Sequence, residues 1–202
     1  MDVQSALFIY LIIVFSSVIH EYSHGLAAYQ LGDPTAKNSG RLTLNPLVHL
    51  DLFGTVLLPF FLLLTAGAFL GYAKPVPFNP LNLRNPKRDT ALIGIAGPGS
   101  NLLVALILGL VLRFFGQSGF LLAISPFLAF IVLVNIWLAL FNLIPLAPLD
   151  GSKVLFGLAP SSWQGSLMSL ERIGFWGFLI ALFLAMTFLP YLSEFVFKLI
   201  VG

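Results

Sequence analysis

Long apolar runs, separated by short polar loops, are the feature that most constrains the fold of this chain. Hydrophobic residues make up 58% of its 202 residues and charged residues only 9%, whereas a soluble domain carries roughly 25% charged residues. Inside a bilayer every backbone polar group must be paired within the protein, so such runs cross as helices. The sequence therefore predicts an all-α polytopic membrane protein, in which residues 1–202 form a single integral membrane domain.

Four runs are long enough to cross a bilayer, which takes about 20 apolar residues. They cover residues 3–31, 90–115, 120–144 and 167–189. A fifth run, 52–70, is interrupted by Pro59 and is expected either to re-enter or to cross as a fifth span. We expect the fourth long run to stop at Pro190, and the amphipathic tail 191–202 to lie in the membrane interface.

The stretch from His20 to His24 places three ionisable groups inside the first apolar run, where such groups are costly and usually functional. It reads H-E-x-x-H. On a helix, His20 and His24 share one face, about 6 Å apart along the axis. This spacing suits two imidazole ligands of one Zn²⁺, with Glu21 beside them to take a proton from water. The alternative is a pair of interfacial histidines with a glutamate that reaches the surface.

A second polar constellation ends the third long run. Pro145 and Pro148 deny helical hydrogen bonds just before Asp150. We expect an unwound segment that holds Asp150 as the third metal ligand, because the chain has no cysteine and must use nitrogen and oxygen ligands. Asp150 could instead cap a helix that starts near Ser152. Asn142 is interpreted either as a polar contact between helices or as a donor to the substrate oxyanion.

These motifs, in this order, resemble those of the site-2 protease family of intramembrane zinc metalloproteases. The resemblance rests on H-E-x-x-H at 20–24, A-G-P-G-S-N at 96–101 and N-x-x-P-x-x-P-L-D-G at 142–151. It implies that His20, His24 and Asp150 bind one zinc ion per chain and that Glu21 is the catalytic base. It also implies that peptide bonds are cut within or near the bilayer. The stretches 45–51 and 71–77 resemble a compact bacterial and archaeal subgroup without a PDZ or CBS domain.

Four further residues are candidates for an accessory role at the site. Asn101 lies in the A-G-P-G-S-N motif of the second long run. His49 lies in a polar loop and could orient water or substrate, replace the aspartate as third ligand, or simply bond to the backbone. Lys74 and Val76 belong to the segment 74–78, whose alternating prolines predict extended chain or an edge strand. An unwound substrate could add to this segment as a strand.

Three classes of function fit these features to different degrees. The first is a zinc protease that acts on transmembrane or membrane-anchored proteins. A transporter or metal-ion channel could use the same polar residues as a permeation path, but four spans without an internal repeat are few for a transporter. A catalytically silent scaffold would not need Glu21. The net charge is only +2, so no nucleic-acid partner is expected, and the oligomeric state is not predicted.

Basic residues on both sides of the run 52–70 predict its topology. Cytoplasmic loops are enriched in lysine and arginine, and the loops here carry Lys37, Arg41, Lys74, Arg84, Lys87 and Arg88. Both loops are therefore expected on the cytoplasmic side, so the run should re-enter rather than cross. The active site should lie near the same face, in the cytoplasmic membrane of a bacterium or archaeon. A full crossing is the alternative.

Overall fold

The computed structural model describes residues 3–57, 61, 74–163, 165, 167 and 174–202 and divides into two compact units, Met1–Pro86 and Lys87–Gly202. Among the described residues, four helices are long and apolar enough to span a membrane, and they include the stretches Leu7–Gln30, Pro86–Phe115, Gly119–Asn142 and Trp176–Val201. The predicted fold class, an all-α polytopic membrane protein, is thus confirmed. That residues 1–202 form a single domain stays a prediction.

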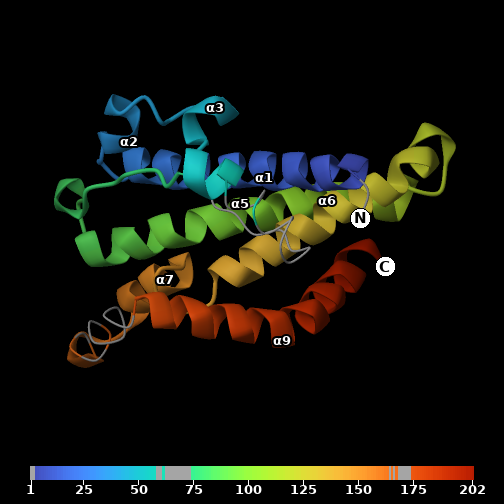
Figure 1. The fold of residues 1–202 in the computed structure, drawn as a ribbon. Coiled ribbons are helices and arrows are strands. Elements are labelled where there is room, and N and C mark those ends of the chain that lie inside the picture. The colour runs from blue at the N-terminus through green and yellow to red at the C-terminus, as the bar shows by residue number, and fades with distance from the viewer. Residues whose placement is uncertain (1–2, 58–60, 62–73, 164, 166, 168–173) are drawn as a thin grey trace. The chain divides into compact units, whose positions relative to one another are not determined.

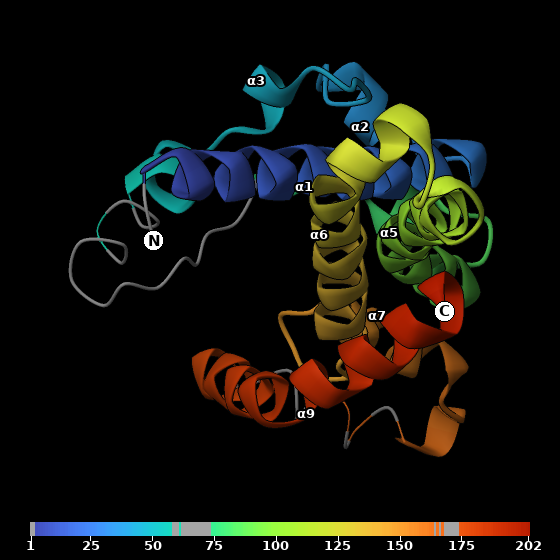
Figure 2. The same ribbon diagram turned by 90° about the vertical axis from the view of Figure 1, so that its right-hand side faces the viewer.

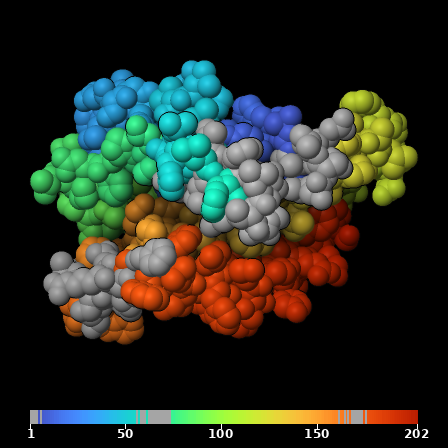
Figure 3. Space-filling view, in the orientation of Figure 1, coloured from blue at the N-terminus to red at the C-terminus, as the bar shows by residue number. Residues whose placement is uncertain are grey.

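The first unit is built on α1 (Val3–Gln30), a helix of 28 residues. Two short helices, α2 (Thr35–Asn38) and α3 (Pro46–His49), pack on α1, and their atoms lie next to each other in the space-filling view (Figures 1 and 3). α1 ends as predicted: Gly32 adopts φ 110°, a left-handed conformation that glycine tolerates best. The chain therefore turns back after α1 and covers its C-terminal half with polar loops.

Asp33 ties the end of α1 to η2 (Pro80–Asn82). Its Oδ1 accepts hydrogen bonds from the Thr35 N–H (3.1 Å), the Thr35 hydroxyl (2.5 Å) and the Asn82 side chain (2.7 Å). Its Oδ2 accepts the N–H of Asn79 at 2.6 Å. Burial alone would raise the pKa of Asp33, but these hydrogen bonds together outweigh it and hold the pKa below the ordinary 3.8. The carboxylate is therefore charged at neutral pH, and its stabilising effect is lost only as the pH falls through that lowered pKa.

The sequence analysis made predictions for two loop segments of the first unit, 74–78 and 52–70. The segment 74–78 was expected to be extended chain or an edge strand, and it is irregular chain. The edge-strand expectation was wrong, since no strand occurs in the part of the chain that the structure describes and Pro75 and Pro77 have no N–H for a strand ladder. Of the run 52–70, the structure describes one π-helical turn, η1 (Leu52–Leu57), and Phe61. The predicted re-entrant hairpin otherwise lies outside the described residues and stays a prediction.

The second unit contains α5 (Pro86–Phe115), α6 (Gly119–Asn142), α7 (Asp150–Leu158) and α9 (Phe175–Val201), with the short η3 (Ser161–Trp163) between α7 and α9. α6 and α9 are in contact, as Figures 1 and 2 show. The core joins Ala105 and Leu112 of α5 to Val132 and Ile136 of α6, and residues of the C-terminal part of α9 pack against it. Arg113 donates to the carbonyls of Leu199 and Ile200 at the end of α9.

Two helix boundaries differ from the prediction. α5 begins at Pro86 rather than at residue 90, because proline suits the first turn of a helix, where its missing N–H is not needed. α9 runs through Pro190 to Val201, so the expectation of a stop at Pro190 and of a separate interfacial tail was wrong. A break inside a membrane would leave several backbone groups unpaired, whereas an internal proline removes one helical hydrogen bond.

Gly109 of α5 provides a test of the packing in the second unit. A Cβ atom added there would lie 2.4 Å from Cγ2 of Ile200. We expect Gly109→Ala to lower the free energy of unfolding by about 1–3 kcal/mol through overpacking, measured as a loss of thermal stability in detergent. Gly99→Ala is the matched control, since its added Cβ meets no other part of the described chain within 4 Å. Equal stability of the two variants would contradict this packing.

Candidate metal centre

His20 and His24, one turn apart on α1, turn their rings towards each other. The two Nε2 atoms are 3.0 Å apart, and the rings meet edge to face with centroids 4.6 Å apart. Both side chains are buried, with 6% and 7% of their surface exposed. Two nitrogen ligands of one tetrahedral zinc would lie about 3.3 Å apart, given Zn–N distances near 2.0–2.1 Å. The histidine pair thus has nearly the separation that one zinc ion requires.

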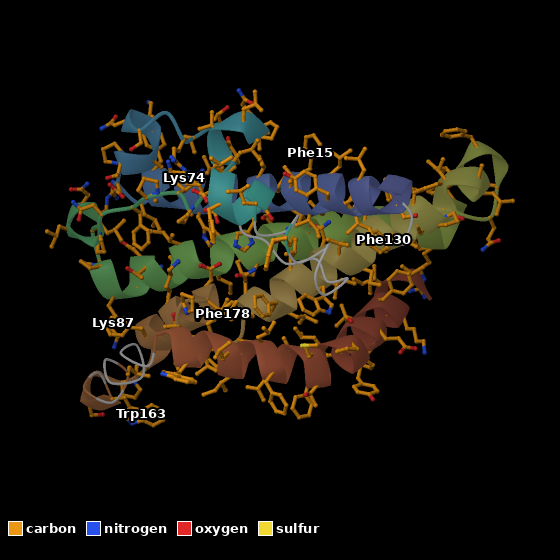
Figure 4. All side chains as sticks on the ribbon, viewed as in Figure 1. Phe15, Lys74, Lys87, Phe130, Trp163 and Phe178 are labelled. Carbon is orange, nitrogen blue, oxygen red and sulfur yellow. The ribbon has the colours of Figure 1, made fainter. Side chains whose placement is uncertain are left out.

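Glu21, between the two histidines in sequence, has a partner that the sequence analysis missed. Its Oε2 accepts the backbone N–H of Val76 at 2.7 Å. Val76 is buried and belongs to the irregular segment that begins at Lys74, which Figure 4 labels beside α1. A signal was present in the sequence, because Val76 stands between two prolines and is the one residue of the three with a backbone N–H to donate.

His49 ends α3 and is almost fully buried, with 1% of its surface exposed. Its Nε2 lies 2.8 Å from the carbonyl of Thr43. A carbonyl only accepts hydrogen bonds, so Nε2 carries a proton and donates it to Thr43. Nδ1 is buried and has no hydrogen-bond partner among the residues that the structure describes. The backbone carbonyl of His49 accepts the N–H of Lys74 at 2.9 Å. His49 is therefore not an exposed interfacial residue, and its contact with water, substrate or metal stays a prediction.

Asp150, in the second unit, is buried and is the first residue of α7, with Leu149 at the N-cap. The expectation that Asp150 sits on an unwound segment was wrong, because the irregular chain ends at Leu149 and Asp150 already belongs to α7. The structure is closer to the alternative, a local helix that starts near Ser152. A carboxylate in the first turn is favoured by the helix dipole, which explains a start at Asp150 rather than near Ser152. Its Oδ1 accepts from Nζ of Lys153 at 2.8 Å, a partner that the i, i+3 spacing could have indicated.

Gly151 fixes the start of α7 against the turn that follows α6. A Cβ atom added at Gly151 would lie 2.3 Å from the carbonyl oxygen of Leu143 and 2.4 Å from that of Ile144. Backbone oxygens cannot give way as a flexible side chain can, so only glycine allows this approach. The position of the Asp150 carboxylate depends on this contact, because Asp150 precedes Gly151 directly.

Two asparagines predicted for the site form contacts within the second unit. Asn101 is fully buried and its Nδ2 donates to Oδ1 of Asn135 at 2.9 Å, which links α5 to α6. Nδ2 of Asn142 donates to the carbonyl of Leu138, one turn earlier in α6, at 2.9 Å. The first contact is the kind of polar contact between helices expected in membranes. An additional role of either residue towards substrate stays a prediction.

Known proteins resemble this chain over most of its length. The family description "Peptidase family M50" matches residues 117–188. The chain is 39% identical over 179 residues to "Putative zinc metalloprotease YwhC" of Bacillus subtilis (strain 168). This alignment covers 85% of this chain and 78% of that protein. It is 29% identical over 188 residues to "Putative zinc metalloprotease Rip2" of Mycolicibacterium smegmatis (strain ATCC 700084 / mc(2)155). This second alignment covers 93% of this chain and 69% of that protein. The chain belongs to peptidase family M50. No solved structure matches it.

Membership in the M50 family confirms the resemblance to site-2 proteases that the motifs indicated. Together with the four described helices that are long and apolar enough to span a membrane, this membership also confirms the predicted class of function, an intramembrane metalloprotease. The transporter alternative finds no support among these relatives. The M50 peptidase is accordingly an integral membrane protein, in a lipid environment that suits membrane-embedded substrates.

Gly151→Ala tests whether the start of α7 positions a metal ligand in this M50 peptidase. We expect the added methyl group to displace Asp150 and to lower both the zinc content per purified chain and the proteolytic rate. Gly99→Ala, which meets no neighbour, should leave both unchanged. Zinc content is measured by atomic absorption after dialysis. Full zinc occupancy in Gly151→Ala would show that this contact does not position a ligand.

Proposed function

We propose that this M50 peptidase is a zinc-dependent endopeptidase that hydrolyses peptide bonds of membrane-spanning proteins within or near the bilayer. One zinc ion per chain would be held by His20, His24 and Asp150, with Glu21 as the catalytic base. The observation that carries the proposal is the buried imidazole pair, with its two Nε2 atoms 3.0 Å apart on an apolar helix.

The donor set supports zinc as the metal. His20, His24 and Asp150 are all buried, and each offers one ligand atom. Two imidazoles and one carboxylate form a known ligand set of catalytic zinc sites, which keep a fourth position open. The histidine separation also fits an N–H···N bond between neutral rings. The relatives named as zinc metalloproteases favour the metal interpretation.

The chain's own residues would share the work of hydrolysis. Zinc, when bound, supplies a Lewis acid that polarises the scissile carbonyl and makes water more acidic. Glu21 takes the proton of the attacking water and passes it to the leaving amine. The N–H of Val76 holds one oxygen of this carboxylate in place. The amide of Asn142 has two N–H donors, of which Leu138 takes one, and we propose that the other donates to the developing oxyanion.

The substrates proposed are transmembrane or membrane-anchored proteins. A substrate helix must unwind locally, because helical hydrogen bonds hide its carbonyl groups. We propose an accessory role in this reaction for four further residues: Asn101, His49, Lys74 and Val76. Basic loops around the first unit support an active site near the cytoplasmic face, and the bacterial relatives support the cytoplasmic membrane of a bacterium as its location.

Glu21→Gln tests the roles of base and ligand separately. We expect cleavage of a reconstituted single-span substrate to fall by about 10²–10⁴-fold, the usual contribution of a general base, while zinc content stays near that of the wild type. His20→Ala and Asp150→Ala should lose zinc as well as activity.

Two results would overturn these assignments. Retained cleavage by Glu21→Gln would remove Glu21 from the mechanism. Loss of zinc from Glu21→Gln would make Glu21 a ligand rather than the base.

A further inference from the structure

We propose that the segment 74–79 is a backbone clamp for the catalytic base, and that Asp33 and Gly25 are positioning residues that act through it. The inference rests on the proposed function, because it takes Glu21 as the base. It assigns the segment a different primary role from the substrate strand expected from its sequence. Four contacts within the first unit carry it.

The first contact is the hydrogen bond at the centre of the clamp. The Val76 N–H donates to Oε2 of Glu21 at 2.7 Å, although the two residues are 55 positions apart in the chain. Pro75 and Pro77 lack an N–H. The clamp therefore presents a single backbone donor to the carboxylate, in one place, between two residues of restricted backbone geometry.

The second contact is the approach of the clamp to α1. Gly25 lies one turn after Glu21 on the same helix face. A Cβ atom at Gly25 would lie 3.1 Å from Cγ1 of Val76 and 3.3 Å from Cβ of Ala36. Both distances are tighter than ordinary van der Waals contact. The absence of a side chain at Gly25 thus lets Val76 lie directly on α1, within reach of the carboxylate.

The remaining contacts fasten the ends of the clamp. At its start, the N–H of Lys74 donates to the carbonyl of His49 at 2.9 Å. At its end, the N–H of Asn79 donates to Oδ2 of Asp33 at 2.6 Å. Asp33 is fully buried and follows α1 closely, so it connects the clamp to the helix that carries Glu21. The N–H of Val76 is therefore held in a fixed position relative to α1.

The clamp and the substrate strand differ in their kinetic consequences. In this arrangement the N–H groups of Lys74 and Val76 are taken up by His49 and Glu21, so they do not serve a substrate. A loosened clamp should misplace the base and lower kcat, with KM unchanged. A loosened substrate strand should raise KM instead.

Asp33→Asn is the single substitution that tests the clamp most directly. Among the described residues, Oδ1 of Asp33 accepts from three donors and Oδ2 accepts only from the N–H of Asn79. The amide oxygen of asparagine should therefore stay with the three donors, and its NH₂ group should face the N–H of Asn79. Two donors cannot bond to each other, so the bond that fastens the end of the clamp is lost. We expect kcat to fall by about 10–100-fold, as for a misplacement of roughly 1 Å, with KM and zinc content unchanged.

Asp51→Asn is the matched control for Asp33→Asn. Oδ1 of Asp51 accepts the N–H of Gly54 at 2.7 Å, a loop contact of the same unit that does not involve the clamp. An asparagine can keep that bond with its amide oxygen. This variant should have the kcat, KM and zinc content of the wild type.

A second series tests the clamp without Asp33. Gly25→Ala should lower kcat because its methyl group pushes Val76 away from Glu21, although alanine favours the helix more than glycine. Val76→Ala keeps the backbone N–H that Glu21 accepts and removes Cγ1, so its own kcat is the reference against which the double variant is compared. The double variant removes the clash with Cγ1 and should recover most of kcat. Such rescue separates displacement of the clamp from damage to the helix.

All variants are measured as full chains in liposomes with one single-span substrate, beside Glu21→Gln. Wild-type kcat in both Asp33→Asn and Gly25→Ala would overturn the clamp, as would a raised KM at unchanged kcat. If Asp33→Asn fails to fold, the Gly25 series decides alone. An active Glu21→Gln would defeat the proposed function itself. An inactive Glu21→Gln beside wild-type Asp33→Asn and Gly25→Ala would defeat only the clamp.

Discussion

Three ionisable side chains on one turn of an apolar helix are the constraint on which the rest of this structure depends. His20, Glu21 and His24 interrupt a run that otherwise suits lipid, and each would be costly there without a partner. The structure supplies partners from inside the protein: the two imidazoles face each other, and the carboxylate accepts a backbone N–H. The polar loops after α1 pack on this helix, and Asp33 accepts four of their hydrogen bonds.

The same requirement explains why irregular chain recurs near the polar residues. The segment 74–79 can serve Glu21 because its prolines prevent it from forming a helix of its own. In the second unit, Pro145 and Pro148 lie between α6 and α7, and Gly151 allows α7 to start at Asp150. In each unit a rigid break in helical structure thus places one polar group that the proposed chemistry needs.

The spans and the site candidates could be predicted from the sequence because they depend on local patterns. Apolar runs set the four long helices, and the i, i+4 spacing set the facing histidines. The course of α9 through Pro190 could not be predicted, because proline's local preference yields there to the cost of unpaired backbone in a membrane. The bond of Val76 to Glu21 and the bond of Asn79 to Asp33 also escaped prediction, since these partners lie 55 and 46 positions away along the chain.

X-ray absorption at the zinc edge of the purified protein tests the central claim most directly. The account predicts two imidazole nitrogens near 2.0–2.1 Å and a carboxylate oxygen near 2.0–2.2 Å, with the same spectrum for Glu21→Gln. Asp150→Ala should bind less zinc and show one oxygen ligand fewer or a water in its place. A spectrum with one imidazole or none, or one that Asp150→Ala leaves unchanged at full zinc content, would contradict it.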